Sequence, residues 1–351
     1  MIPIVKPTEM EQEIFELELD SFMPDMALDA HAHMWAGTPT YGEASELSPW
    51  TEEDMTVAKF RELMTDFMPG RTFGGLMLAL PMGIHGMPPA ALDTVTFQAE
   101  HIASQANPDP LCGSTMFVSP KLDPDYVRQE VQRLNINGLK CYHTESERRP
   151  TSDSDIPEYL PEEFIRIAHD FGMTVTLHMV KPRAVADPSN QHWIRTYCEK
   201  YPNMNMVLAH AARSFNPVWA MEGIASLKGL PNVYCDTAAI GEVGACEAII
   251  ENLGHDRLVW ATDFPLTHWR GNYVAFGNTH FWVGSDYVHD DKQDEYVFHG
   301  LEQLRVIKQA AWHQRLNDSQ VEDIFFNNLS GLLDMTGQID SKAPGIGPYP
   351  I

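Results

Sequence analysis

The sequence predicts a (β/α)8 barrel, the TIM-barrel fold, for most of the chain. Three observations lead to this prediction. Short, nearly continuous apolar runs recur eight times, amphipathic stretches separate several of them, and 351 residues suit one large α/β domain. Runs rich in Val, Ile, Leu, Met and Ala are typical of parallel strands that are covered on both faces. An open doubly wound sheet is the alternative, because alternation alone does not show closure.

The strands and helices of the predicted barrel follow one another in order along the chain. The eight strand candidates are 26–31, 73–81, 111–120, 137–143, 172–179, 205–212, 232–239 and 257–265. Amphipathic stretches that precede the fourth, fifth, sixth and eighth strands are 123–135, 160–172, 190–202 and 244–254. The stretch at 160–172 ends on a glycine that suits a helix C-cap. We expect 318–335 to form the closing helix of the barrel.

The predicted domain organisation is an N-terminal arm (1–25), a barrel (26–335) and a C-terminal tail (336–351). Two segments exceed ordinary loop lengths, 34–60 after the first strand and 266–300 after the eighth. The second is rich in Trp, Tyr and Phe, which argues against disorder. Because active sites of barrels lie at the carboxyl ends of the strands, we expect both segments to form walls over a substrate, with 266–300 as a lid.

The composition favours a cytoplasmic protein that acts on small molecules. The formal charge of −25, from 24 Lys and Arg against 49 Asp and Glu, argues against nucleic acid or an anionic membrane as the main partner. The acidic, proline-containing start is not a signal peptide, and no apolar run approaches the roughly 20 residues of a membrane span. The cysteines lack CxxC spacing, so we expect reduced, buried thiols at Cys112, Cys141, Cys198, Cys235 and Cys246.

Polar residues stand at the ends of several predicted strands. His31 and His33 in "ALDAHAHM" are two positions apart, so a strand would direct both imidazoles to the same side. Polar side chains that end apolar runs are costly to bury unless they are hydrogen-bonded, paired or bound to metal. In a closed barrel the strand ends converge. The residues that share this position are His31, His33, Lys140, His178, His210 and Asp263. Imidazoles and a carboxylate suit Zn²⁺ or a similar divalent ion.

Each of these residues also has a purely structural interpretation. A single histidine at a strand end, such as His178, is often a hydrogen-bonded structural residue. Asp263 precedes "FP" and could cap a turn, and Lys140 could extend its ammonium group to solvent. The metal hypothesis therefore depends on all of them falling at strand ends together. The sequence contains no P-loop, GxGxxG or GxSxG pattern that would favour phosphate, dinucleotide or serine-hydrolase chemistry.

The ordered set of motifs resembles the amidohydrolase superfamily. The phrases "LDAHAH", "LAHAA", "ATDFP" and "IFFNNLSGLL" are similar to its amidohydrolase-2 branch, over about residues 26–335. That branch contains amino-carboxymuconate-semialdehyde decarboxylase, resorcylate-type decarboxylases and several lactone hydrolases.

The resemblance implies one divalent metal ion, with zinc expected and manganese or another divalent ion as the alternative. The implied ligands are His31, His33, His178 and Asp263. The ion would lower the pKa of a bound water towards about 7, Asp263 would act as general base, and His210 would polarise the substrate carbonyl. A second metal is not expected. In binuclear relatives a lysine at the end of strand four is carboxylated and bridges two ions. For Lys140 we instead expect an ammonium group that pairs with an anionic substrate or a nearby carboxylate.

The branch contains both hydrolases and decarboxylases, and the metal ligands do not distinguish them. The decarboxylases typically carry "NGF"-like text at strand four, whereas this chain has "NGLKCYH". The difference favours hydrolysis of a C–O or C–N bond, as in a lactone, ester or amide. A non-oxidative decarboxylase is the alternative, and a non-catalytic metal- or ligand-binding barrel is a third hypothesis.

The expected substrate is a small molecule that carries a carboxylate or is cyclic. Lys140, Arg213 and Arg183 could contact a carboxylate, although each could equally form a structural ion pair. His268 and Trp269 are candidate substrate-binding residues, because aromatic side chains stack on flat rings, although they could equally fill a small core within the lid. A homo-oligomer is possible, since the arm or the tail could reach a neighbouring copy, although an arm that lies on its own barrel is as plausible.

Overall fold

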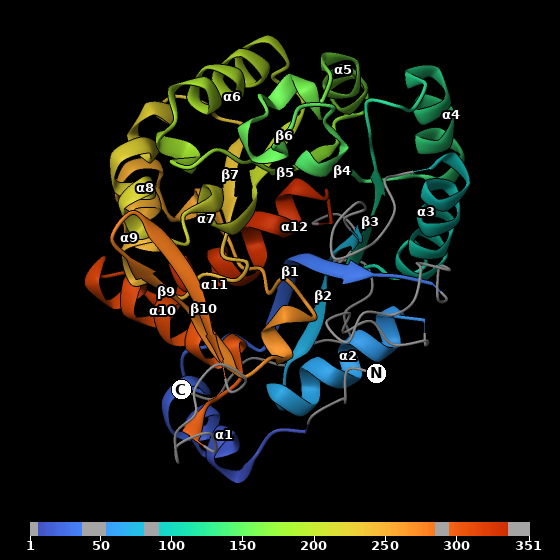
Figure 1. The fold of residues 1–351 in the computed structure, drawn as a ribbon. Coiled ribbons are helices and arrows are strands. Elements are labelled where there is room, and N and C mark those ends of the chain that lie inside the picture. Colours follow the sequence, from blue (N-terminus) through green and yellow to red (C-terminus); the bar gives the residue numbers. More distant parts are fainter. Residues whose placement is uncertain (1–5, 37–53, 81–90, 285–294, 336–351) are drawn as a thin grey trace.

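The computed structural model is a (β/α)8 barrel, as the sequence predicts, and it describes residues 6–36, 54–80, 91–284 and 295–335 (Figure 1). Eight parallel strands lie side by side in chain order. Their bounds are β1 Met26–Met34, β2 Thr72–Ala79, β3 Cys112–Phe117, β4 Gly138–Tyr142, β5 Thr174–His178, β6 Asn205–Leu208, β7 Val233–Asp236 and β8 Leu258–Val259. All eight overlap the predicted strands.

The barrel closes between β1 and the segment that follows β8. Ala30 N donates to Trp260 O at 2.9 Å, and His33 N donates to Phe264 O at 3.1 Å. The eighth strand is shorter than predicted because the backbone leaves the β7 ladder after Val259. Trp260 N then donates to Ile324 O at 2.8 Å. Asp263 therefore lies on a connecting segment rather than in a strand.

Most of the described helices cover the outside of the barrel, whereas α7 (Ala209–Arg213) lies at its carboxyl end and lines the cavity. Their bounds are α1 Glu9–Ile14, α2 Val57–Phe67, α3 Leu92–Ala106, α4 Pro124–Leu134, α5 Glu162–Phe171, α6 Pro188–Lys200, α7 Ala209–Arg213, α8 Pro217–Gly223, α9 Val243–Leu253, α10 His299–His313, α11 Asp318–Glu322 and α12 Asn328–Leu332. Helix α5 ends at Gly172, whose φ of 64° suits glycine. The predicted closing helix is present over residues 318–332, and it contains a π-helical turn at Asp323–Asn327 between α11 and α12.

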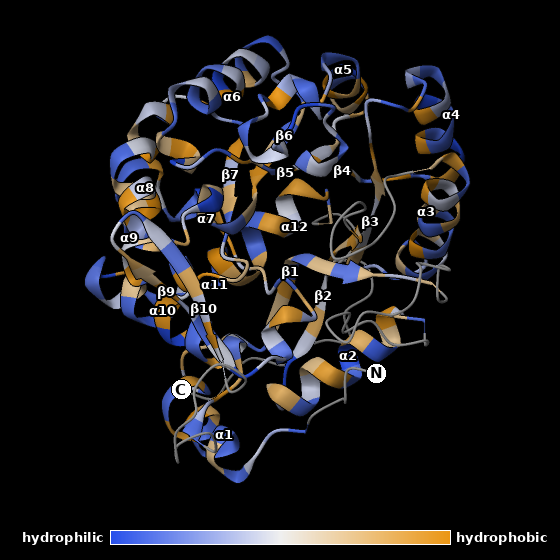
Figure 2. Ribbon diagram, in the orientation of Figure 1, coloured by the Kyte–Doolittle hydropathy of each residue, from blue (hydrophilic) through white to orange (hydrophobic). Residues whose placement is uncertain are grey.

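Apolar side chains form two layers of core. The larger layer lies between the strands and the helices, and the helix faces that turn towards the barrel are the more hydrophobic ones (Figure 2). A smaller cluster lies inside the barrel and includes Leu28, Leu76, Val207 and Val259. Leu329 of α12 packs against this inner cluster. Because the interior of the barrel is apolar, the side chains that could bind metal or catalyse a reaction lie at the carboxyl ends of the strands.

The described part of the predicted lid forms an antiparallel hairpin, β9 Gly271–Phe276 and β10 Thr279–Gly284. Residues 285–294 of the lid, and residues 37–53 of the first predicted wall, lie outside the described residues. The C-terminal tail, 336–351, also lies outside them, so the predicted domain limits stay a prediction.

The N-terminal arm packs on its own barrel. Helix α1 begins with Thr8 as its N-cap, and Phe15 and Leu19 on the following π-helical turn are fully buried. The five cysteines are free and buried, as the sequence predicts. Within the described residues, none of the helices has the length and apolar character needed to cross a membrane.

Candidate active site

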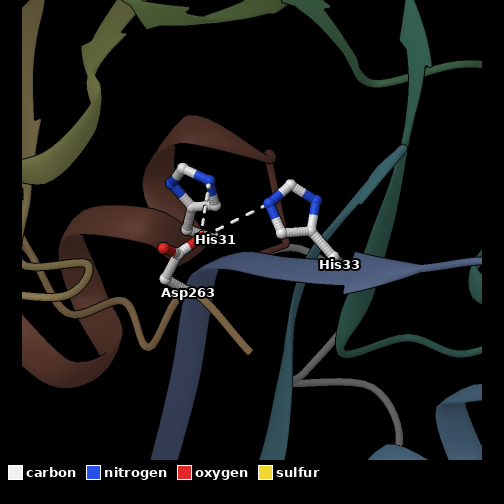
Figure 3. A group of neighbouring side chains, drawn as sticks. All are labelled: His31, His33 and Asp263. Atoms are coloured by element: carbon white, nitrogen blue, oxygen red, sulfur yellow. Dashed lines mark ion pairs between the residues drawn. The ribbon is translucent and has the colours of Figure 1, made fainter. Parts of the chain in front are cut away.

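Two histidines of β1 and an aspartate that follows β8 meet at the carboxyl end of the barrel (Figure 3). The Nε2 atoms of His31 and His33 each lie 3.4 Å from Asp263 Oδ1. The three potential ligand atoms lie within 4.8 Å of one another. Residues separated by more than 200 positions in the sequence therefore form one cluster, as the metal hypothesis requires.

The seam between β1 and the segment after β8 sets this geometry. Asp29 is fully buried, and its Oδ1 accepts hydrogen bonds from His31 N at 2.8 Å and from Thr262 N at 3.0 Å. One carboxylate thus fixes the backbone of His31 on one side of the seam and, on the other side, that of Thr262, the residue before Asp263. Burial raises the pKa of Asp29 to about 7, although the hydrogen bonds from Thr262 and His31 oppose that shift.

The second nitrogen of each β1 histidine has an acceptor as its partner. His31 Nδ1 lies 2.8 Å from Asp236 Oδ2, and His33 Nδ1 lies 3.1 Å from Ala79 O. A carbonyl or carboxylate oxygen accepts, so the proton is assigned to Nδ1 in both rings. Each Nε2 then presents its lone pair to the cluster. Such partners orient metal-binding imidazoles in proteins.

The donor set fits a divalent transition ion. Burial lowers the pKa of His31 well below its ordinary value, so the ring is neutral and able to ligate. Burial alone would raise the pKa of Asp263, but His210, His33 and His31 outweigh it and hold that pKa below its usual value. Imidazoles and an ionised carboxylate are typical zinc ligands.

His178, at the end of β5, points into the same cavity. It is buried, and its ring centroid lies 4.9 Å from that of His210 and 4.1 Å from that of Tyr142. Its Nδ1 has no hydrogen-bond partner among the residues that the structure describes. The structure does not place His178 within the compact cluster of His31, His33 and Asp263, so its role as a fourth ligand stays a prediction.

His210 follows β6 and is held by two contacts. Its backbone N donates to Asp236 Oδ1 at 2.6 Å, and its Nδ1 lies 3.0 Å from Ala238 O. Its ring centroid lies 5.2 Å from that of His31. His210 is thus adjacent to the cluster of candidate metal ligands without being part of it. This position suits a residue that contacts the substrate.

The backbone that carries His210 is left-handed over four residues. From His210 to Arg213, φ lies between 49° and 60°. Such a turn disfavours residues with a Cβ. It presents two side chains to the cavity, His210 at its start and Arg213 at its end.

Lys140 lies at the centre of the polar cluster. Its side chain is completely buried, and its Nζ lies 3.1 Å from His31 Nε2. Burial lowers its pKa. Within the described residues it forms no salt bridge with a carboxylate, so the predicted pairing with a nearby carboxylate is not seen. An anionic substrate remains the predicted partner.

These residues line a cavity of about 320 Å³. The side chains that face it are His31, His33, Lys140, Tyr142, His143, His178, His210, Arg213, Phe215, Asp263, Pro265, Leu266, Trp269, Tyr273 and His280. Arg213 Nε is buried and has no hydrogen-bond partner in the described part of the chain. Among the described side chains that line the cavity, Asp263 is the only acid, whereas Lys140 and Arg213 are basic.

Two of the proposed substrate contacts lie elsewhere. His268 packs in an aromatic cluster with Phe67, Phe264 and Phe298 rather than on the cavity wall. Arg183 forms an ion pair with Glu222 on the surface. Both arrangements are structural, as the alternative interpretation of each residue allowed. Trp269 and Arg213 do line the cavity.

Sequence reasoning missed several residues of the site. Asp236 ends β7, and the strand-end rule that selected the other candidates could have found it. Tyr142 and His143 lie two and three positions after Lys140 on the chain, but no pattern distinguishes them. Tyr273 and His280 reach the cavity only because the hairpin folds back over the barrel.

The chain is similar to amidohydrolases in sequence and fold. The family model Amidohydro_2, described as Amidohydrolase, matches residues 28–281. A zinc-bound amidohydrolase from Burkholderia multivorans has 14% identity and a TM-score of 0.52, with 88% of this chain and 99% of that chain covered. No curated protein matches the sequence.

Solved structures of both reaction types share the fold. A protein from Pseudomonas putida described as a 2-pyrone-4,6-dicarboxylic acid hydrolase has 14% identity and a TM-score of 0.56, covering 90% of this chain and 99% of that chain. The 5-carboxyvanillate decarboxylase LigW from Sphingomonas paucimobilis has 14% identity and a TM-score of 0.54, covering 89% of this chain and 100% of that chain.

Proposed function

The chain belongs to the amidohydrolase family of enzymes, and from this premise we propose that it is a metal-dependent hydrolase. Its reaction is the cleavage of a C–O or C–N bond in a lactone, ester or amide. The substrate is small and carries a carboxylate, and a flat ring would fit the aromatic walls. The observation that carries the proposal is the cluster of His31, His33 and Asp263 at the floor of the cavity.

The residues of the cluster have distinct roles in this proposal. His31, His33 and Asp263, with His178 as a further ligand, would hold a zinc ion. The ion would lower the pKa of a bound water molecule, so that this water could lose a proton at neutral pH and act as a nucleophile. Asp263 accepts the proton of the attacking water at its carboxylate and passes it to the leaving group. His210 stabilises the negative charge that develops on the carbonyl oxygen of the substrate.

The charge of the cavity supports an anionic substrate. The protein as a whole carries a charge of −25, yet the described part of the cavity wall has Lys140 and Arg213 against one acid, Asp263. A guanidinium group binds a carboxylate through two parallel hydrogen bonds, and Arg213 Nε has no partner within the described residues. Trp269 and Tyr273 provide aromatic surface for a flat ring.

The proposal includes the cellular compartment of the enzyme. Free, buried cysteines are typical of the reducing cytoplasm, so we place it there. A lactone is the first substrate class to examine, since one structural relative is described as a hydrolase of a pyrone dicarboxylic acid. Decarboxylation is the competing reaction, because LigW shares the fold.

A substrate panel tests the proposal. The zinc-loaded protein is incubated with carboxylated lactones, aryl esters, anilides and hydroxybenzoates, while acid release and CO₂ release are measured separately. Hydrolysis that is lost in Asp263→Asn supports the proposal. Release of CO₂ without hydrolysis would replace it with a decarboxylase. Stoichiometric zinc with no turnover of any compound would favour a binding function.

A further inference from the structure

The hairpin over the cavity has a closed stem. Arg270 and Phe298 form an antiparallel bridge, Gly271 N donates to Val297 O at 3.1 Å, and His299 N donates to Trp269 O at 2.8 Å. The chain therefore leaves the barrel before β9 and returns before α10 through one pair of adjacent strands. The position of this stem decides where the hairpin lies.

A carboxylate of the N-terminal arm binds both sides of the stem. Glu11 in α1 is 1% exposed. Its Oε1 accepts from Arg270 Nε at 2.9 Å and from Phe298 N at 2.9 Å, while its Oε2 accepts from Arg270 Nη2 at 2.7 Å. Figure 1 shows α1 beside the lower end of the hairpin. Residue 11 thus joins two segments that lie almost 260 and 290 positions further along the chain.

The arm holds Glu11 in this position through the helix start. Thr8 N donates to Glu11 Oε2 at 2.7 Å, and Thr8 Oγ1 accepts from Glu11 N in a capping box. The Arg270 guanidinium also lies over the Phe298 ring, 4.5 Å from its centroid. The carboxylate is therefore fixed on its own side as well as on the side of the hairpin.

The hairpin that Glu11 holds at its stem contacts the cavity with its inner face. The inner face of the hairpin carries Tyr273 and His280, and their rings lie 4.6 Å and 4.8 Å from that of Phe215. The Phe215 ring in turn lies 5.0 Å from that of His210. A continuous series of contacts runs from Glu11 through the stem and the inner face of the hairpin to His210.

We propose that Glu11 is a positioning residue for the active site, acting through the stem of the hairpin. Its carboxylate fixes the stem and thereby the distance of Tyr273 and His280 from the other walls of the cavity. This distance determines how closely the cavity fits a substrate. Loss of the charge leaves Arg270 without its buried partner, which is a costly arrangement. The stem then opens more often, and the cavity loses one wall for part of the time.

Hydrogen exchange of the hairpin tests the proposal directly. The comparison uses Glu11→Gln and a matched control, Glu18→Gln, in the full-length protein. Glu18 belongs to the same arm and pairs with Arg305 of α10 at 2.8 Å and 2.6 Å, away from the stem. We expect amides of 271–284 to exchange at least about tenfold faster in Glu11→Gln. We expect no change there in Glu18→Gln, and no change in β1 or in zinc content in either variant.

Equal hairpin exchange in Glu11→Gln and wild type, or faster exchange confined to the arm, would overturn the proposal. If Glu11→Gln does not fold, Arg270→Lys keeps the charge but loses the two-pronged contact, and the same exchange comparison applies. A second measurement, of KM and kcat, rests on the proposed function because it needs a compound that the enzyme hydrolyses. With any hydrolysed compound of the panel, KM rises at least about fivefold in Glu11→Gln while kcat falls less. The exchange result holds or fails independently of whether a substrate is found.

Discussion

Asp236 Oδ2 lies 2.8 Å from His31 Nδ1, and both side chains are completely enclosed by protein. Burial raises the pKa of Asp236 to about 6, so the carboxylate is mostly ionised at neutral pH. Its other oxygen accepts from the backbone N of His210 at 2.6 Å. One aspartate therefore orients a candidate metal ligand and the residue proposed to contact the substrate.

Asp236→Asn should weaken zinc binding roughly 10- to 100-fold. The asparagine oxygen can still accept from His210 N, but its amide group then faces His31 Nδ1–H, and two donors oppose each other. Isothermal titration with Zn²⁺ measures the change. An affinity equal to that of the wild type would show that His31 needs no such partner.

His178→Ala should lose most of its bound zinc on dialysis. The His178 ring is buried beside His210, and no described residue forms a hydrogen bond with its Nδ1 that would hold it for another purpose. His268→Ala is the control, because His268 packs among phenylalanines outside the cavity. Metal content by atomic emission checks both. Full zinc occupancy in His178→Ala would show that His178 of β5 is not a metal ligand.

Arg213→Gln should raise KM for a carboxylated substrate roughly tenfold to hundredfold, because a charge-assisted hydrogen-bond pair is lost. The same variant should hydrolyse the corresponding methyl ester as well as wild type does. Arg183→Gln provides the control, since Arg183 pairs with Glu222 on the surface. Equal losses for the acid and for its ester would mean that Arg213 supports the fold rather than the substrate.

Ala212→Gly and Ala220→Gly should differ in stability although both remove a methyl group that is 0% exposed. Ala212 has a φ of 57°, where glycine is favoured, whereas Ala220 lies inside α8, where glycine is disfavoured. We expect the free energy of unfolding of Ala212→Gly to exceed that of Ala220→Gly by about 2 kcal/mol. Urea denaturation measures the two values. Equal values would show that the left-handed turn stores no strain.

The barrel and the centre of the site could be predicted because both follow from short-range patterns. Apolar runs of strand length predict parallel strands, and the alternation of a strand places His31 and His33 together. The convergence of strand ends then brings Asp263 to them. The family match over residues 28–281 confirms the resemblance on which the other roles depend.

The remaining features depend on contacts between segments that are distant in the sequence. Nothing near Glu11 indicates that it binds Arg270, and the inner face of the hairpin is defined only by its fold over the barrel. His268 illustrates the reverse case, since its neighbours along the chain suggest a cavity wall while Phe67 and Phe298 enclose it. The positive φ values of His210 to Arg213 also occur without a glycine to mark them.

The seam of the barrel has a consequence for synthesis of the protein. Two imidazoles of the cluster belong to the first strand, but the carboxylate follows the last one. A growing chain on the ribosome carries His31 and His33 long before Asp263 emerges from the exit tunnel. The complete cluster of His31, His33 and Asp263 therefore forms only after all eight strands of the barrel have been translated, and binding of a metal ion by all three side chains must follow closure of the barrel.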